Sequence, residues 1–87
     1  YGGPDLRFEE LEVDANSRHA GQTIRDLRIR KETGALVVAI RRADGSFTAT
    51  PSPDTRIDAG TTLIAMGTEP ELQALEELFA RESFGAA

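Results

Sequence analysis

The sequence predicts a small α+β domain with the element order β-α-β-β-β-α, in which helices pack against a sheet of about four strands. Its 87 residues are enough for one small domain. Strand-like apolar segments are separated by two segments whose apolar residues have helical spacing. An Asp-Gly pair at residues 44–45 marks a hairpin, and a capping pattern at residues 68–71 marks the start of the last helix.

The first strand is expected within "LRFEELEVDA". Leu11 and Val13 share one face of this segment, and acidic residues occupy the other. Leu6 and Phe8 have the opposite parity, so the apolar pattern breaks before Leu11. We expect either a bulge or a strand that begins only near Glu9.

A short helix is expected near residues 22–28, because Ile24 and Leu27 are three positions apart and suit one helical face. A turn or a second helical piece should follow near residues 30–33. Gly34 is the natural end of this region, since glycine adopts the left-handed conformation that often closes a helix.

The segment "ALVVAIRR" gives the clearest strand. It is rich in β-branched residues and apolar on both faces, which is typical of a strand inside a sheet with both faces covered. Asp44 and Gly45 then predict a hairpin turn, after which "FTAT" returns as a short strand. Pro51 and Pro53 end this strand, because proline cannot donate to a strand ladder.

The last strand and the last helix are expected in "TTLIAMG" and "TEPELQALEELFARE". Thr68 can cap the helix, Pro70 suits its first turn, and Glu71 stands where a capping box requires an acidic residue. The expected buried stripe of this helix consists of Leu72, Leu75, Leu78 and Phe79. We therefore place one domain at residues 9–82, with a lead-in at residues 1–8 and a flexible tail at residues 83–87.

The composition excludes several classes of protein. There is no Cys, which excludes disulfides and Cys-based metal sites, and a single His cannot form a cluster. The longest apolar run, residues 35–40, is far shorter than the about 20 residues of a membrane span. The acidic first residues do not resemble a signal peptide. Because the chain begins without Met, we expect it to be a fragment or the trimmed end of a longer protein.

The net charge of −5 argues against general nucleic-acid binding, because such domains are usually basic. The charge is unevenly distributed. Residues 1–16 and 68–87 each carry a net charge of −4, whereas residues 25–42 carry +4. A basic middle in an acidic protein can present a local anion site. The simpler interpretation is a solvated surface that balances the acidic ends.

No pattern in the sequence indicates catalysis. His19 stands alone in a polar loop, and the serines and glycines form no nucleophile elbow, dinucleotide fingerprint or P-loop. Asp54 and Asp58 could offer oxygen ligands to a hard cation, but the spacing is not that of an EF-hand. Asp54 after Pro53 is more typical of a turn cap. We therefore do not expect an enzyme.

Most of the chain, about residues 9–80, resembles the C-terminal domain of bacterial regulator-of-potassium-conductance proteins, known as RCK_C or TrkA-C. The motifs that carry the resemblance are, in order, "GQTIRDL", "RKETG", "VAIRR", Pro53-Asp54-Thr55, "IDAG" and "LIAMGTEPEL". Their order and spacing are specific together, although no single motif is decisive. One departure is Thr61 after Gly60, where the family usually has Asp, and it affects local capping only.

The resemblance implies a homodimeric β-α-β-β-β-α domain on the cytoplasmic side of a potassium channel, potassium uptake system or cation/proton antiporter. Several members of the family bind cyclic di-AMP at the dimer interface, and others bind different effectors or divalent ions. Carried over to this sequence, the binding positions are Arg30, Ala35, Leu36, Val37, Thr50, Pro51 and Ser52. Binders often have Asn or a similar polar residue near the start of the second strand, where this chain has Leu36.

Three functions follow as hypotheses. In the first, the chain is a cyclic di-AMP sensor in which Arg28 or Arg30 reaches a phosphate. In the second, it is a structural dimerisation module, in which Leu36 and Val37 belong to the sheet and dimer core and Arg30 pairs with Glu32 or an acidic end. In the third, it binds a divalent cation. The candidate acidic ligands are Glu10, Glu12, Asp54 and Asp58.

Overall fold

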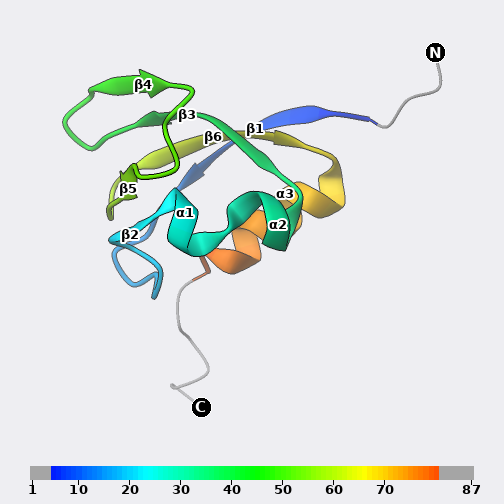
Figure 1. The fold of residues 1–87 in the computed structure, drawn as a ribbon, viewed down its shortest axis with the longest axis horizontal. Coiled ribbons are helices and arrows are strands. Elements are labelled where there is room, and N and C mark those ends of the chain that lie inside the picture. Colours follow the sequence, from blue (N-terminus) through cyan, green and yellow to red (C-terminus); the bar gives the residue numbers. More distant parts are fainter. Residues whose placement is uncertain (1–4, 81–87) are drawn as a thin grey trace.

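The computed structural model describes residues 5–80. The elements are β1 (Arg7–Glu12), β2 (Gln22–Thr23), α1 (Ile24–Leu27), α2 (Ile29–Thr33), β3 (Leu36–Arg41), β4 (Phe47–Ala49), β5 (Arg56–Ile57), β6 (Thr62–Gly67) and α3 (Glu69–Leu78). Four strands form an antiparallel sheet in the order β1-β6-β3-β4, and β2 pairs with β5 in a small second sheet (Figure 1). The α+β class with a four-stranded sheet is confirmed. The predicted tail at residues 83–87 lies outside the described residues.

Strand β1 begins earlier than expected. Its register against β6 is continuous from Arg7 opposite Gly67 to Glu12 opposite Thr62, so the expectation of a bulge or a late start is wrong. The break in apolar pattern has another cause. Phe8 lies on the face of the sheet that carries the alternating acidic residues, and it is 69% exposed there.

Strand β3 lies inside the sheet as predicted, between β6 and β4. The expectation that both its faces are covered is wrong, because the described helices pack on one face only (Figure 1). The register against β6 shifts between Val37 and Ala39, so Val38 is an irregular position. This shift breaks the strict alternation of the strand, and it explains a continuous apolar run without two covered faces.

The region before β3 differs in detail from the prediction. Residues 22 and 23 pair with β5 instead of starting the helix, and α1 begins only at Ile24. A second short helix, α2, follows at Ile29, close to the second helical piece that the sequence predicted. The pairing with β5 was not visible in the sequence, because a two-residue strand has no periodicity to detect.

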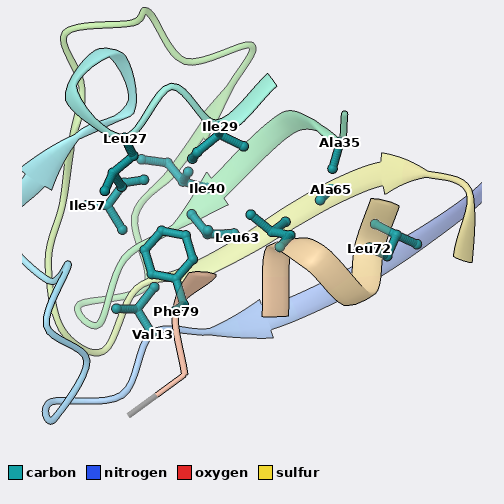
Figure 2. Packing of buried hydrophobic residues seen from close by; sticks show 11 residues of the cluster. Val13, Leu27, Ile29, Ala35, Ile40, Ile57, Leu63, Ala65, Leu72 and Phe79 are labelled. Carbon is teal, nitrogen blue, oxygen red and sulfur yellow. The ribbon is translucent and has the colours of Figure 1, made fainter. Parts of the chain in front are cut away.

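The core lies between the helices and the covered face of the sheet (Figure 2). Ile40, Ile57 and Leu63 are fully buried, and Val13 and Phe79 close the cluster beside them. Burying each large apolar side chain contributes about 1.5–3 kcal/mol. These contacts therefore hold α1, α2 and α3 against the sheet.

Helix α3 begins at the predicted capping box. The backbone N–H of Thr68 donates to Glu71 Oε1 at 2.9 Å, and the Thr68 side chain accepts from the backbone of the third helical residue. Leu72 and Leu75 are buried as expected. Among residues 5–80, no helix combines the length and the apolar character that a membrane crossing requires.

Candidate functional site

The predicted binding residues lie on two sides of β3. Arg30 is exposed on α2, and Leu36, the first residue of β3, is 40% exposed. Ala35 is fully buried in the core, and Val37 is half-buried. Residues 50–52 follow β4 on the other side. The structure brings Arg30 and Leu36 into one hollow, whose described lining does not include residues 50–52.

The conformation of α1 and α2 turns Arg30 away from the core. Arg28 has a left-handed backbone, with φ of 50°, and separates the two helices. Ile29 and Thr33 stand one turn apart and are buried, and the Thr33 hydroxyl donates to the Ile29 carbonyl oxygen at 2.7 Å. Gly34 ends α2 in the left-handed conformation, with φ of 83°, as predicted. Arg30 therefore lies on the solvent side of α2.

The segment Thr50-Pro51-Ser52 is clamped between β3 and α1. The N–H of Thr50 donates to the carbonyl oxygen of Val38 at 2.8 Å. Beyond the segment, the N–H of Arg25 donates to the carbonyl oxygen of Pro53 at 2.7 Å, and Arg25 Nε lies 3.0 Å from Asp54 Oδ1. These contacts make the segment a fixed wall beside β3, as the two prolines suggested.

A hollow of about 250 Å³ opens where α2, the end of β6 and the start of α3 meet. Its lining comes from three parts of the chain that are distant in sequence: Leu6, Arg30, Gly34, Leu36, Met66, Gly67, Thr68 and Glu71. Of these, only Arg30 and Leu36 were predicted. The capping pattern marked Thr68 and Glu71 as structural residues, but nothing in the sequence indicated that they face the same hollow as Arg30.

The basic middle segment contains both paired and unpaired cations. The paired ones are Arg25 with Asp54, Arg41 with Glu10, and Arg42 with the hydroxyl of Thr48. The unpaired ones are Arg28, Arg30 and Lys31. Their side chains are exposed and make no hydrogen bond or ion pair with another residue from 5 to 80. The alternative in which Arg30 pairs with Glu32 is therefore not found in this part of the chain. Of the three, Arg30 belongs to the described lining of the hollow, so Arg30 is the cation available to an anion there.

The acidic residues considered as cation ligands do not converge. Glu10 pairs with Arg41 at 3.1 Å, and Asp54 pairs with Arg25. Over the described residues, no three His, Cys, Asp or Glu side chains form a group that could hold a metal ion. The divalent-cation hypothesis therefore finds no support in the geometry.

Two carboxyl groups have shifted pKa values, and both lie outside the hollow. A hydrogen bond with Glu76 raises the pKa of Glu9, and partial burial and repulsion from Glu76 act in the same direction. Hydrogen bonds from Ser46 lower the pKa of Asp44 in the hairpin turn. Glu9 and Asp44 line separate small surface hollows, and each shift has a hydrogen bond to a neighbouring side chain or backbone group as its main cause.

Comparisons with known proteins agree with the sequence resemblance. The chain is 31% identical over 78 residues to the probable potassium channel protein 2 of Methanocaldococcus jannaschii. The match covers 90% of this chain and 22% of that protein. The chain therefore corresponds to less than a quarter of the length of this relative.

Two solved structures share the fold closely. One is the RCK_C domain dimer of S. agalactiae BusR in complex with c-di-AMP, with a TM-score of 0.78, 30% identity, and coverage of 83% of this chain and 93% of that one. The other is the RCK C domain of the potassium transport protein KtrA in complex with c-di-AMP, with a TM-score of 0.74, 33% identity, and coverage of 84% and 82%.

The sequence pattern of the TrkA-C domain matches residues 8–80. This range includes all described helices and strands, apart from Arg7, the first residue of β1. This match spans most of the 87 residues. The chain therefore belongs to the TrkA-C domain family.

Proposed function

We propose that this chain is a regulatory domain of a potassium channel or related cation transport system, and that it binds cyclic di-AMP at a homodimer interface in the cytoplasm. The observation that carries the ligand proposal is the hollow in which unpaired Arg30 lies beside exposed Leu36. Two structurally similar domains, those of BusR and KtrA, have been solved with c-di-AMP, and the BusR domain as a dimer. The potassium-channel relative supports the regulatory role.

The chemistry of the residues suits a cyclic dinucleotide. Its phosphates carry negative charge, and the Arg30 guanidinium offers several hydrogen-bond donors in a fork that fits phosphate oxygens. Its adenines need apolar surface, which Leu36 and Pro51 can supply at the two sides of β3. Because Leu36 offers no polar group, Arg30 carries more of the anion recognition here than it would in a chain with Asn at this position.

The size of the hollow supports a dimeric site. One copy encloses about 250 Å³, whereas sites for drug-sized molecules have about 300–1,000 Å³. Two copies related by a two-fold axis double this volume and present each contact twice. Cyclic di-AMP has the same two-fold symmetry. A single ligand can therefore straddle the axis and be enclosed by both copies.

The clamped segment at residues 50–52 links such a ligand to the rest of the domain. A ligand that contacts α2 and this segment bridges the two sides of β3. Such a ligand is also linked to α1 through this segment, because Arg25 of α1 bonds to Pro53 and Asp54 just beyond it. Binding then favours the arrangement in which α1, α2 and the segment have the correct separation. This is a physical route from ligand binding to regulation.

Calorimetric titration of the 87-residue chain with cyclic di-AMP tests the proposal. Arg30→Ala should weaken binding about tenfold or more, because a hydrogen bond to a charged group contributes about 1.5–3 kcal/mol. Lys31→Ala is the matched control, since it removes one exposed charge from the same helix outside the described lining of the hollow. The affinity of this variant for cyclic di-AMP should stay within about twofold of the wild-type affinity. A folded chain that binds no cyclic di-AMP at saturating concentration would refute the ligand proposal.

The second candidate function is a ligand-independent dimerisation module, and the open face of the sheet favours it. Phe8 and Phe47 are 69% and 57% exposed on this face, beside half-buried Ile64 and Met66. Exposed apolar surface of this kind often marks an association site. Light scattering over a dilution series, with and without cyclic di-AMP, separates the two functions. The module predicts a dimer whose stability does not change when cyclic di-AMP is added.

A further inference from the structure

Strand β1 forms one edge of the four-stranded sheet and pairs with β6 on one side only. Its register is regular over all six residues, Arg7–Glu12, and it contains no proline. On its outer side, the backbone of β1 makes no hydrogen bond with another residue from 5 to 80. An edge of this kind is a template on which another extended segment can pair.

The backbone groups that point to this outer edge follow from the pairing. Val13, directly after β1, makes both of its backbone hydrogen bonds with residues 60 and 61, which precede β6, at 2.9 and 2.8 Å. In an antiparallel ladder, the backbone groups of successive residues point to alternate sides. The odd-numbered residues of β1 therefore bond to β6. The even-numbered ones, Phe8, Glu10 and Glu12, direct their N–H and C=O groups toward the outer edge.

The opposite edge of the sheet is protected against pairing, and β1 is not. Strand β4 has only three residues, Phe47–Ala49, and Pro51 prevents its extension. Short edge strands, prolines and lysines are common protections of this kind. Strand β1 has none of them. It carries glutamates instead, which exclude some partners and admit others.

The glutamates exclude a second copy of β1 as the partner. Every central antiparallel register of two such strands places glutamates opposite one another, as Glu9 with Glu9, Glu10 with Glu10, or Glu9 with Glu10. Like charges directly opposite in a sheet are destabilising. A segment with Lys or Arg at these positions is attracted instead. Glu12 is exposed and has no ion pair with another residue from 5 to 80, so its carboxylate is available.

A hollow of about 370 Å³ lies at the end of this edge and has the same preference for positive charge. Its described lining is Glu12, Val13, Asp14, Ala15 and Gly60, which includes two carboxylates and no cation. The charge of residues 1–16 as a whole is −4. A lysine or arginine side chain opposite Glu12 on a docked strand can reach into this hollow.

We infer that the outer edge of β1 is a docking site for an extended, basic segment of a partner protein. The segment adds a fifth strand, antiparallel to β1. Its basic side chains lie opposite Glu10 and Glu12, and an apolar side chain lies against Phe8, which is 69% exposed. This surface is separate from the hollow beside Arg30, so it does not depend on the proposed nucleotide binding.

Hydrogen exchange measured by NMR tests the inference. The probe is the acetylated and amidated peptide Lys-Val-Lys-Thr-Tyr, whose lysines align with Glu12 and Glu10 and whose tyrosine aligns with Phe8. In the free 87-residue chain, the amides of these three residues should exchange faster than those of Glu9 and Leu11, which bond to β6. At half saturation, the peptide should slow the exchange of the three outward amides about twofold and leave the other two unchanged.

Matched variants separate the role of charge from that of the backbone. A peptide with glutamate in place of both lysines keeps the same backbone and should not bind. Glu12→Lys should weaken binding of the basic peptide about three- to tenfold and allow the acidic peptide to bind. Glu32→Lys makes the same change of charge at an exposed position on α2, and it should alter affinity by no more than about twofold.

Three results would overturn the inference. The first is unchanged exchange of the outward amides at millimolar peptide in a folded chain. The second is equal binding of the basic and acidic peptides, since the edge would then select no charge. The third is slower exchange of these amides when the concentration of the chain alone is raised, with a matching rise in mass by light scattering. That result would identify a second copy as the occupant.

Discussion

On the face of the sheet that the helices cover, Ile40, Leu63 and Ala65 are at most 1% exposed, whereas Phe8 and Phe47 on the open face are 69% and 57% exposed. Both faces belong to the same strands. Alternate residues serve one face or the other, except at the register shift near Val38 in β3. The difference teaches that apolar residues of one strand have separate roles. Those on the covered face stabilise the fold, and those on the open face remain available for association.

The comparison predicts unequal effects of shortening an apolar side chain on the two faces. Leu63→Ala on the covered face should cost about 2–5 kcal/mol of unfolding free energy, because the residue is fully buried and leaves a cavity. Phe8→Ala on the open face should change it by no more than about 0.5 kcal/mol in dilute solution. Urea unfolding at low protein concentration measures both. An equal loss for the two variants would show that Phe8 is part of the monomer core and would break the comparison.

The next largest effect should come where α2 meets the covered face. Gly34→Ala places a methyl group 2.7 Å from Glu71 Oε2 and forces alanine to φ of 83°, so we expect a loss of about 1–3 kcal/mol. Gly45→Ala is the matched control, because it has φ of 90° but nothing within 4 Å of the added atom. The difference in unfolding free energy between the two variants isolates the contact with Glu71. If they lose the same amount, the backbone conformation alone explains the requirement for glycine.

The smallest effect should appear at the margin of the covered face, and it should depend on pH. Because Glu76 raises the pKa of Glu9 in the folded state, the folded chain binds a proton more readily than the unfolded chain. The stabilisation is complete below the unfolded pKa and is lost as pH rises through the folded pKa. Glu9→Gln should therefore give a slightly higher Tm than wild type near pH 7, and this advantage should shrink below about pH 4.5.

Thermal unfolding across this pH range provides the measurement. Glu12→Gln is a suitable control, since it removes an exposed carboxylate from the opposite face of the same strand. A wild-type Tm that responds to pH no differently from that of Glu9→Gln would show that the two carboxylates do not interact in solution.

Features that depend on local chemistry were predictable from the sequence. The hairpin at Asp44-Gly45, the capping box of Thr68 and Glu71, and the left-handed end of α2 at Gly34 each follow from residues within one turn of each other. The order of the main strands and helices followed from periodicity. The family resemblance added the seven binding positions, and their role in this chain stays a prediction.

Features that depend on distant pairing were not predictable. Phe8 interrupted the apolar alternation of the first strand, which suggested a bulge or a late start of that strand. Its pairing with Met66, on a strand more than fifty residues away, could not be seen in the local sequence. The apolar run of β3 suggested two covered faces, since a sequence does not show which face receives the helices. The hollow was missed for the same reason, because its lining joins Leu6 to residues 30–36 and 66–71.

The two prolines after β4 have a further consequence for the backbone of β3. Pairing with β4 starts only at Ala39, and the Thr50 N–H reaches the Val38 carbonyl oxygen just beyond it. Pro51 has no N–H, so the ladder cannot continue toward Leu36. The first residues of β3 therefore pair with β6 on one side and with no strand on the β4 side. A residue other than proline at position 51 would supply a backbone N–H for further pairing. Strand β4 could then extend along the start of β3, which lies between Arg30 and the clamped segment.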